Sequence, residues 1–348
     1  MNTSDIMFTI SRTCGVVILG AMAACGGGQA ANKPAESSST TPAKKAEGQP
    51  ALASATQAAA PSGRPIWDTH IHFFQVTRQG GVDWPTPKFK GLYRDILPTE
   101  YKEVAKKNGI VATGIVEASP KVSDDDWILS ITKGDDFFKF FVGQLEIGSP
   151  GFSADLNRLA KDSRFVGIRG FLWSPKMTLD AKQLASCKEL AAKGMTLDII
   201  SRGDLNPKDK VDQLAEAVPK LHIIIDHLGG AKGENPDPKW VEAINKLAKH
   251  PNIYMKFSSF FDMFNPGSGE EEPWKSPENV SAYKPHFDVL MKAFGEDRLI
   301  WGSNWPVVEQ GGGVTKEIAI AEEYLKSYGN DVRDKVMYKN AQKFYARH

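Results

Sequence analysis

The chain has 348 residues, of which 41% are hydrophobic and 24% are charged, as in an ordinary globular protein. Its 43 lysine and arginine residues are balanced by 42 aspartate and glutamate residues, so the formal net charge is +1. This balance argues against nucleic acid as a partner, because nucleic-acid binders carry a basic surplus or stripe. The mean hydropathy of −0.34 argues against a protein with several membrane spans.

The first 24 residues are typical of a bacterial secretory signal. Their apolar run, Gly15 to Ala24, is too short to cross a membrane as a helix. It ends in small residues directly before Cys25, and this pattern resembles a lipobox, whose cysteine is diacylated and becomes the mature N-terminus. We expect cleavage after residue 24 and lipidation of Cys25, with a plain secretory signal as the alternative. The protein would then be lipid-anchored in the cell envelope, at the outer membrane or facing the periplasm.

Residues 25–63 have the composition of a linker. After Cys25 they are mainly alanine, proline, serine, threonine, glycine, glutamine and lysine, and they contain no valine, isoleucine, phenylalanine or tryptophan. Such a segment cannot bury enough apolar surface to offset its ordering entropy. We expect a flexible tether between the membrane and a folded domain over residues 64–348. Only Cys187 remains in that domain, which excludes an intramolecular disulfide.

Short apolar runs alternate with helical patterns through the whole of that domain. Strands are predicted at 65–72, 112–119, 140–147, 166–173, 195–201, 222–227, 252–258 and 299–304. Helices are predicted at 98–108, 124–137, 153–162, 181–193, 207–218, 238–250, 280–294, 315–328 and 331–347. Eight β–α units in a single domain favour an α/β fold of the (β/α)₈ TIM-barrel type. No phosphate-binding glycine motif follows the first strand, which argues against an open nucleotide-binding sheet.

Histidines gather at the predicted strand ends, where the active site of such a barrel lies. His70 and His72 alternate with Asp68 on the first strand, so we expect the three side chains to share one face. His227 ends the sixth strand and Asn304 ends the eighth. Paired imidazoles can bind a metal or polarise a substrate oxygen. Asp68, one layer deeper, would orient an imidazole.

These strand ends resemble the amidohydrolase superfamily. The resemblance rests on three motifs, which are Asp-x-His-x-His at 68–72, Asp-His-x-Gly at 226–229 and Gly-Ser-x-Trp-Pro at 302–306. Within the amidohydrolase-2 branch, the chain is similar to the sugar-lactonase-like group, with its fuconolactonase-like and 2-pyrone-4,6-dicarboxylate lactonase-like enzymes. The resemblance covers residues 65–345 and implies a (β/α)₈ barrel that hydrolyses a small molecule, either a lactone or a sugar acid derivative.

The sequence departs from the family at Asn304, where the resemblance implies an aspartate that acts as base or metal ligand. An amide cannot take up a proton near neutral pH. One explanation is a divalent metal, zinc or manganese, at His70, His72 and His227, which would generate hydroxide without that aspartate. In a metal-independent alternative, another carboxylate serves as the general base. Glu117 is then preferred over Glu146 and Asp262. A third explanation is a barrel that binds without turnover.

Substrate-binding residues are expected beside these catalytic candidates. Arg169 lies near the end of the fourth strand, and its guanidinium suits a carboxylate or a lactone carbonyl, a role that the resemblance also implies. Arg202 follows the fifth strand and would assist it, while Lys256 on the seventh strand has no predicted direction. Trp173 and Trp305 end strands and would stack on a sugar ring. The favoured activity is hydrolysis of a lactone, with a metal-dependent decarboxylase and a carbohydrate- or acid-binding barrel as alternatives.

Overall fold

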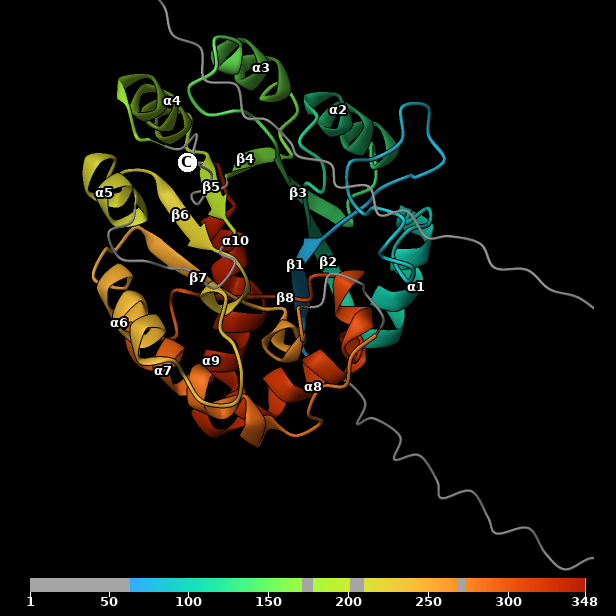
Figure 1. The fold of residues 1–348 in the computed structure, drawn as a ribbon, viewed down its shortest axis with the longest axis vertical. Coiled ribbons are helices and arrows are strands. Elements are labelled where there is room, and N and C mark those ends of the chain that lie inside the picture. Colours follow the sequence, from blue (N-terminus) through green and yellow to red (C-terminus); the bar gives the residue numbers. More distant parts are fainter. Residues whose placement is uncertain (1–62, 171–177, 201–209, 268–272, 348) are drawn as a thin grey trace, which may run out of the picture. The chain divides into compact units, whose positions relative to one another are not determined.

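A computed structural model describes residues 63–170, 178–200, 210–267 and 273–347. The signal, Cys25, the tether, Trp173 and Arg202 lie outside these ranges. Eight parallel strands follow one another around a barrel in chain order (Figure 1). They are β1 Ile66–Ile71, β2 Ile110–Val116, β3 Phe138–Gly143, β4 Phe165–Gly170, β5 Thr196–Ile199, β6 His222–Ile225, β7 Ile253–Ser258 and β8 Leu299–Gly302. The expected (β/α)₈ barrel is confirmed.

Eight helices, α1 to α8, form a ring outside the strands, and two short C-terminal helices follow them (Figure 1). They are α1 Pro98–Asn108, α2 Val122–Ile131, α3 Phe152–Leu159, α4 Ala181–Ala192, α5 Lys210–Ala217, α6 Pro238–Leu247, α7 Lys284–Phe294, α8 Val314–Leu325, α9 Asn330–Asp334 and α10 Asn340–Phe344. The single helix predicted at 331–347 is interrupted by a π-helical turn, Lys335–Lys339. In the described ranges, no helix combines the length and apolarity that a membrane span requires.

The barrel closes between its first and last strands. A parallel bridge joins Ile71 to Trp305. The His72 amide donates to the Trp305 carbonyl at 2.8 Å, and the Asn304 amide donates to the His70 carbonyl at 2.8 Å. Closure therefore fixes the backbones of the histidines on β1 relative to that of Asn304 after β8.

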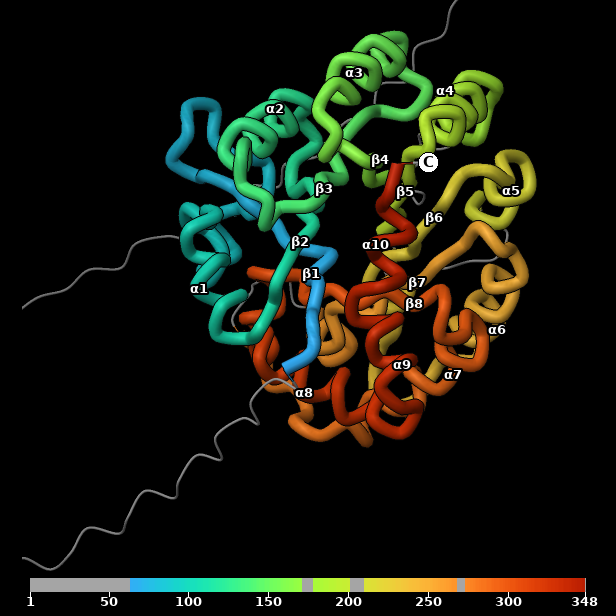
Figure 2. Tube along the Cα trace, turned by 180° about the vertical axis from the view of Figure 1, so that it is seen from behind, coloured from blue at the N-terminus to red at the C-terminus, as the bar shows by residue number. Residues whose placement is uncertain are grey.

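The opposite end of the barrel is filled by the C-terminal helix. Tyr345 stacks on Phe140 with ring centroids 3.9 Å apart, and Phe344 packs 4.6 Å from Tyr254. Figure 2 shows α10 crossing this end of the strands. Apolar side chains from most strands join the same buried cluster. The open end, at the carboxyl ends of the strands, is consequently the end available to a substrate.

Candidate active site

An irregular register in β1 directs its histidines into the barrel. Asp68 pairs with Thr113 but Ile71 pairs with Ile115, so three steps on β1 oppose two on β2, which marks a bulge. Asp68 consequently lies on the helix side, where Tyr101 of α1 donates to its carboxylate at 2.7 Å and the Ser303 amide donates at 2.8 Å. The prediction that Asp68 shares the face of His70 and orients an imidazole is wrong, because strict alternation fails across a bulge.

The turn after β6 brings the consecutive side chains of Asp226 and His227 close to the ring of His70. His227 and Leu228 have φ of 55° and 53°, in the left-handed region that non-glycine residues rarely occupy. The His227 ring centroid lies 4.5 Å from that of His70. The Asp226 carboxylate lies 3.6 Å from Nδ1 of His70. Asp226 was not among the predicted site residues, although its place directly before His227 at a strand end was a usable signal.

Left-handed backbone recurs at the end of each of the last three strands. His227, Ser259 and Asn304 follow β6, β7 and β8 with φ of 55°, 59° and 61°. Each such residue costs about 1 kcal/mol or more of conformational energy. Strain of this kind persists where the surroundings over-determine it, and it clusters at functional sites. The three positions therefore mark the barrel mouth as the specialised part of this fold.

The three histidines are held in the neutral state. Burial, followed by the charges of Lys256, His72 and Arg169, lowers the pKa of His70 well below its ordinary value. Burial and neighbouring charges also lower the pKa of His227, and they lower that of His72 to about 3. At neutral pH these rings therefore act as hydrogen-bond partners or metal ligands and carry no charge.

His72 is engaged at both ring nitrogens. Its Nδ1 lies 2.9 Å from the Val116 carbonyl oxygen and its Nε2 lies 3.0 Å from Oδ1 of Asn304. Asn304 in turn donates through Nδ2 to Oγ of Ser259 at 2.8 Å. His72 thus lies beside the group of His70, Asp226 and His227, and its ring nitrogens are not among the ligand atoms that converge there.

A buried ion-pair network underlies this centre. Lys256 of β7 is fully buried, with Nζ 2.9 Å from Oδ2 of Asp198 and 3.6 Å from Oδ1 of Asp226. Tyr345 donates to the same oxygen of Asp198 at 2.8 Å. Lys256 and Tyr254 are two residues apart on β7, so their side chains point to the same side of the sheet. Because Tyr254 packs inside the barrel, Lys256 also points inward, toward the site. The sequence pattern left this direction open, and Asp198 was not among the predicted site residues.

Arg169 and Glu117 form the second charged pair of the site. Nε of Arg169 donates to Oε1 of Glu117 at 2.7 Å, and a terminal nitrogen donates to the Glu117 carbonyl at 2.5 Å. The other terminal nitrogen lies 3.5 Å from Nε2 of His70. Burial raises the pKa of Glu117, and the charge of Arg169 opposes this shift. Glu117 therefore lies at the strand end as expected, but it holds the predicted substrate-binding arginine in place.

A cavity of about 350 Å³ opens above these side chains. Its wall residues come from several strand ends and from the β1–α1 loop: His72, Trp84, Glu117, Ala118, Ser119, Pro120, Arg169, Ile200, His227, Asp262, Asn304 and Val307. The volume suits a small organic molecule. Glu117 and Asp262 are the two carboxylic residues of this wall among the described residues.

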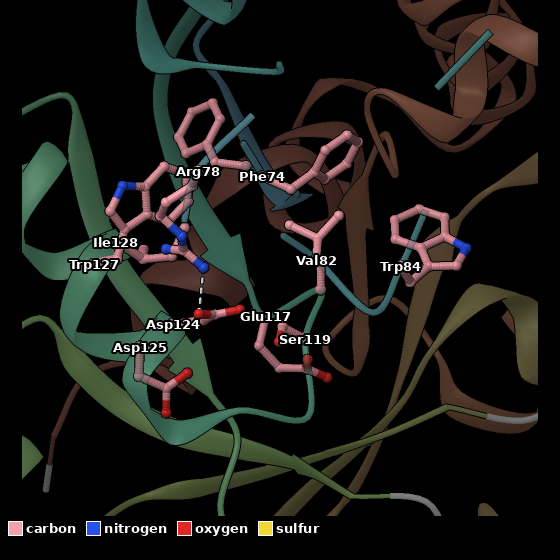
Figure 3. Close-up of a pocket in the computed structure, with 12 residues that line it drawn as sticks. Phe74, Arg78, Val82, Trp84, Glu117, Ser119, Asp124, Asp125, Trp127 and Ile128 are labelled. Atoms are coloured by element: carbon pink, nitrogen blue, oxygen red, sulfur yellow. Dashed lines mark hydrogen bonds and ion pairs between the residues drawn. The ribbon is translucent and has the colours of Figure 1, made fainter. Parts of the chain in front are cut away.

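A smaller pocket adjoins the cavity and shares Trp84 and Glu117 with it (Figure 3). There Arg78 forms an ion pair with Asp124, and its guanidinium lies 4.6 Å from the ring centroid of Trp127. These contacts attach the β1–α1 loop to α2. They thereby support Trp84, whose ring centroid lies 5.9 Å from that of His72 at the cavity wall.

Two further predicted residues lie away from the cavity. Trp305 is 1% exposed and packs 5.0 Å from Tyr101 and 6.3 Å from Phe73, measured between ring centroids. It is a core residue between β8 and α1, so the prediction that it stacks on a substrate is wrong. Glu146 follows β3 and is absent from the described wall of the cavity. Trp173 and Arg202 lie outside the described residues.

One group of side chains in this site has the composition of a metal centre. Ligand atoms of His70, Asp226 and His227 lie within 4.8 Å of one another. Both Asp226 oxygens are buried without a hydrogen-bond partner, and both imidazoles are neutral, as ligation requires. The residues present therefore fit a divalent cation, with Asp226 in the position that the sequence analysis gave to His72. The ammonium of Lys256 lies close by and opposes a further positive charge.

The chain matches the family model described as amidohydrolase over residues 67–347. This span includes all eight strands and the histidine–aspartate centre. The chain belongs to the amidohydrolase family.

Two curated relatives of this amidohydrolase are named as lactonases. An L-fucono-1,5-lactonase from Burkholderia ambifaria is 28% identical over 294 residues, which cover 80% of this chain and 94% of the relative. An L-rhamnono-gamma-lactonase from Scheffersomyces stipitis is 27% identical over 227 residues, covering 58% and 66%. A crystal structure of an amidohydrolase from Burkholderia multivorans with bound zinc superposes with a TM-score of 0.70. It is 19% identical and covers 82% of this chain and all of that one. Its likeness supports the fold.

Proposed function

We propose that this amidohydrolase opens the ring of a sugar lactone by attack of an activated water. The observation that carries the proposal is the convergence of His72, His227 and Arg169 at the wall of a single cavity, with the fully buried ring of His70 packed against both histidines. Hydrolysis of a lactone builds negative charge on the carbonyl oxygen, and donors aimed at that oxygen stabilise the transition state. The lactonase names of two relatives point to the same substrate class.

In this proposal Arg169 binds the reacting carbonyl at the cavity wall, and the buried ring of His70 lies behind it. Nε and one terminal nitrogen of Arg169 donate to Glu117, and the other terminal nitrogen lies 3.5 Å from His70 Nε2. This last nitrogen is the donor that a carbonyl oxygen in the cavity can accept from. Glu117 fixes the guanidinium so that little reorganisation is needed during the reaction. Trp84 supplies an apolar wall for the ring of the substrate.

We also propose that His70, Asp226 and His227 hold a divalent metal, zinc or manganese. When bound, such an ion lowers the pKa of a water ligand toward neutrality. The neutral imidazoles and the unpartnered carboxylate of Asp226 support this assignment. A metal-independent site, in which Lys256 and Arg169 supply the positive charge, is the alternative that the same experiment decides.

For the cell, we propose that the enzyme is exported and lipid-anchored through Cys25. The support is the sequence alone: an apolar run, small residues before Cys25, and a polar linker up to residue 63. Labelling cells with a palmitate analogue tests it, because a Cys25→Ser variant would lose the label. A label retained in that variant would contradict the proposal.

The test of the activity is a panel of 1,5- and 1,4-aldonolactones, with acid release followed by a pH indicator. Each assay is run with protein as purified, after treatment with a chelator, and after addition of zinc or manganese. Turnover that falls on chelation and returns with metal supports both proposals. Turnover insensitive to chelation supports the lactonase without the metal. A folded protein that is silent on every lactone contradicts the activity and favours the decarboxylase or binding alternatives.

A further inference from the structure

We infer that Asp262 is the general base of this site. The inference rests on the proposed lactone hydrolysis and adds a catalytic residue to it. Water must lose a proton as it attacks, and a carboxylate within reach of the cavity is the simplest acceptor. Glu117 and Asp262 are the two carboxylic residues of the described cavity wall, so the choice lies between them.

Glu117 is already paired with Arg169. Its Oε1 accepts a hydrogen bond from Arg169 Nε at 2.7 Å, and the guanidinium also holds its carbonyl oxygen. Proton uptake by Glu117 would break a buried ion pair and leave Arg169 without its counter-charge, which is costly in a low-dielectric site. Glu117 is therefore a poor base and a good support for Arg169.

Asp262 is free of such a commitment. Its carboxylate accepts one hydrogen bond, from Oγ of Ser259 at 2.8 Å, and no ion pair is present at it within the described part of the chain. The side chain is half-buried, as a group that lines a cavity must be. A carboxylate with unused lone pairs at a cavity wall can accept a proton from water without breaking an ion pair.

A hydrogen-bonded chain fixes Asp262 relative to the histidines. Ser259 donates to Asp262, and Asn304 donates through Nδ2 to Ser259 at 2.8 Å. Oδ1 of Asn304 in turn lies 3.0 Å from Nε2 of His72. Asn304 and Ser259 both have left-handed backbone, so two strained residues keep this chain in place. The amide of Asn304 therefore positions the carboxylate of Asp262, which supplies the titrating group that residue 304 lacks.

Burial and neighbouring groups act on the pKa of Asp262 in opposite directions. Burial raises its pKa, while the Ser259 hydrogen bond and the charge of Lys232 oppose that shift. Lys232 comes from the loop after β6 and donates to the Asp262 carbonyl at 2.7 Å. Glu317 of α8 also faces Asp262 and is itself held at raised pKa by burial. A pKa above the ordinary value for aspartate increases basicity while leaving the ionised form available.

In this reaction Asp262 takes one proton from water and returns it to the leaving group. The oxygen of water bonds to the lactone carbonyl carbon while its proton passes to the Asp262 carboxylate. The carbon–oxygen bond of the ring then breaks, and the proton returns from Asp262 to the departing ring oxygen. The product is an open hydroxy acid, and the enzyme is unchanged.

The test uses Asp262→Ala and Asp262→Asn in the full chain, with Asp136→Asn as the matched control. Asp136 is exposed and lies in the turn before β3, away from the cavity. We expect kcat to fall by about 10²–10⁴-fold in both Asp262 variants, the usual value of a general base. The acidic limb of the kcat/KM–pH profile should vanish, and added formate should partly restore Asp262→Ala. The control should retain the wild-type rate and profile.

Every outcome of this experiment supports or overturns the assignment of Asp262 as the general base. Asp262→Asn turning over within threefold of wild type overturns the inference, as does a loss that formate does not rescue and that leaves the acidic limb intact. Thermal melts of all variants separate chemistry from misfolding, and a variant that unfolds is replaced by Asp262→Ser under the same criteria. A wild-type protein inactive on every lactone overturns the proposed function as well. An active wild type with an active Asp262 variant overturns the base alone.

Discussion

The Lys256 ammonium lies 3.3 Å from Nδ1 of His70, between the metal-type centre and the buried Asp198. An ammonium group can only donate, so Nδ1 of His70 accepts and its Nε2 carries the proton. That nitrogen faces Arg169 at the cavity side of the ring. Lys256 thus sets the tautomer of His70 and, with Arg169, gives the site a positive charge of its own.

Removing the Lys256 charge should weaken the fold. Lys256→Met leaves Asp198 buried without its cation and removes one of the two cations near Asp226, and breaking a buried pair costs about 3–5 kcal/mol. Urea unfolding of Lys256→Met against wild type measures the loss. The double variant Lys256→Met/Asp198→Asn should recover part of it, because one uncompensated charge is removed. Equal stability of wild type and Lys256→Met would contradict the ion-pair account.

The same variant should bind zinc more tightly. The ammonium lies 3.6 Å from the Asp226 carboxylate, so it repels a divalent ion at His70, Asp226 and His227. At an effective dielectric constant of about 20, like charges about 4 Å apart repel each other by several kcal/mol. We therefore expect a zinc dissociation constant at least ~10-fold lower in Lys256→Met, measured by competition with a chelating dye. An unchanged or weaker affinity would place the metal elsewhere.

His70 should be essential for turnover. The neutral ring lies behind Arg169, and its loss removes the support of this donor to the developing oxyanion, an effect of about 10²–10³ in kcat. His70→Ala tests this, with His222→Ala as the control. His222 starts β6 and packs against Tyr254 and Phe344 at the closed end of the barrel. Full rate in His70→Ala, or equal loss in both variants, would remove His70 from the chemistry.

The strands and helices were predictable because their periodicity is local. Each predicted strand overlaps an observed one, and α1 begins and ends at the predicted residues, Pro98 and Asn108. The bulge in β1 was not predictable, since the extra residue is defined only by pairing with β2. Because of this one bulge, Asp68 points to the helix side. In a regular strand, residues two positions apart, such as Asp68 and His70, would point to the same face.

The location of the site was predictable where the strand pattern alone places a residue near a strand end, as with His70, His227 and Arg169, whose roles in the chemistry stay predictions. It was not predictable where the role depends on a partner. Asp198 becomes a site residue only because Lys256 crosses the barrel to it, and Glu117 changes from a base to a support because Arg169 meets it. Trp305 was misplaced because a strand-end tryptophan can face the cavity or the helices, and only packing against Tyr101 decides.

Exchanging the carboxylate and amide between positions 262 and 304 tests their coupling. Asn304→Asp alone places two carboxylates on one serine hydroxyl, which can donate to only one of them. We expect kcat at pH 7 to fall about tenfold or more, because the like charges raise the pKa of the pair. Asn304→Asp/Asp262→Asn restores one carboxylate and one amide and should recover rate relative to either single variant. Additive losses in the double variant would show that the two positions act independently.

Acid should destabilise the fold through buried histidines, and His286 isolates this effect from the active site. His286 of α7 is fully buried, 5.1 Å from Trp240 between ring centroids, and burial lowers its pKa from 6.5 to about 4. Between those values the unfolded chain binds the proton and the folded chain does not. His286 therefore does not reduce the free energy of unfolding above about pH 6.5, and it reduces this free energy as the pH falls from 6.5 toward 4.

One such group changes the unfolding free energy by up to about 1.4 kcal/mol per pH unit within that window. His286→Phe keeps a ring against Trp240 and removes the titration. We expect wild type to lose about 1–2 kcal/mol more than His286→Phe between pH 6.5 and 5, measured by urea unfolding at each pH. The active-site histidines are present in both proteins, so their contribution cancels in the difference. Parallel pH curves for the two proteins would show that His286 is protonated to the same extent in the folded and unfolded chains.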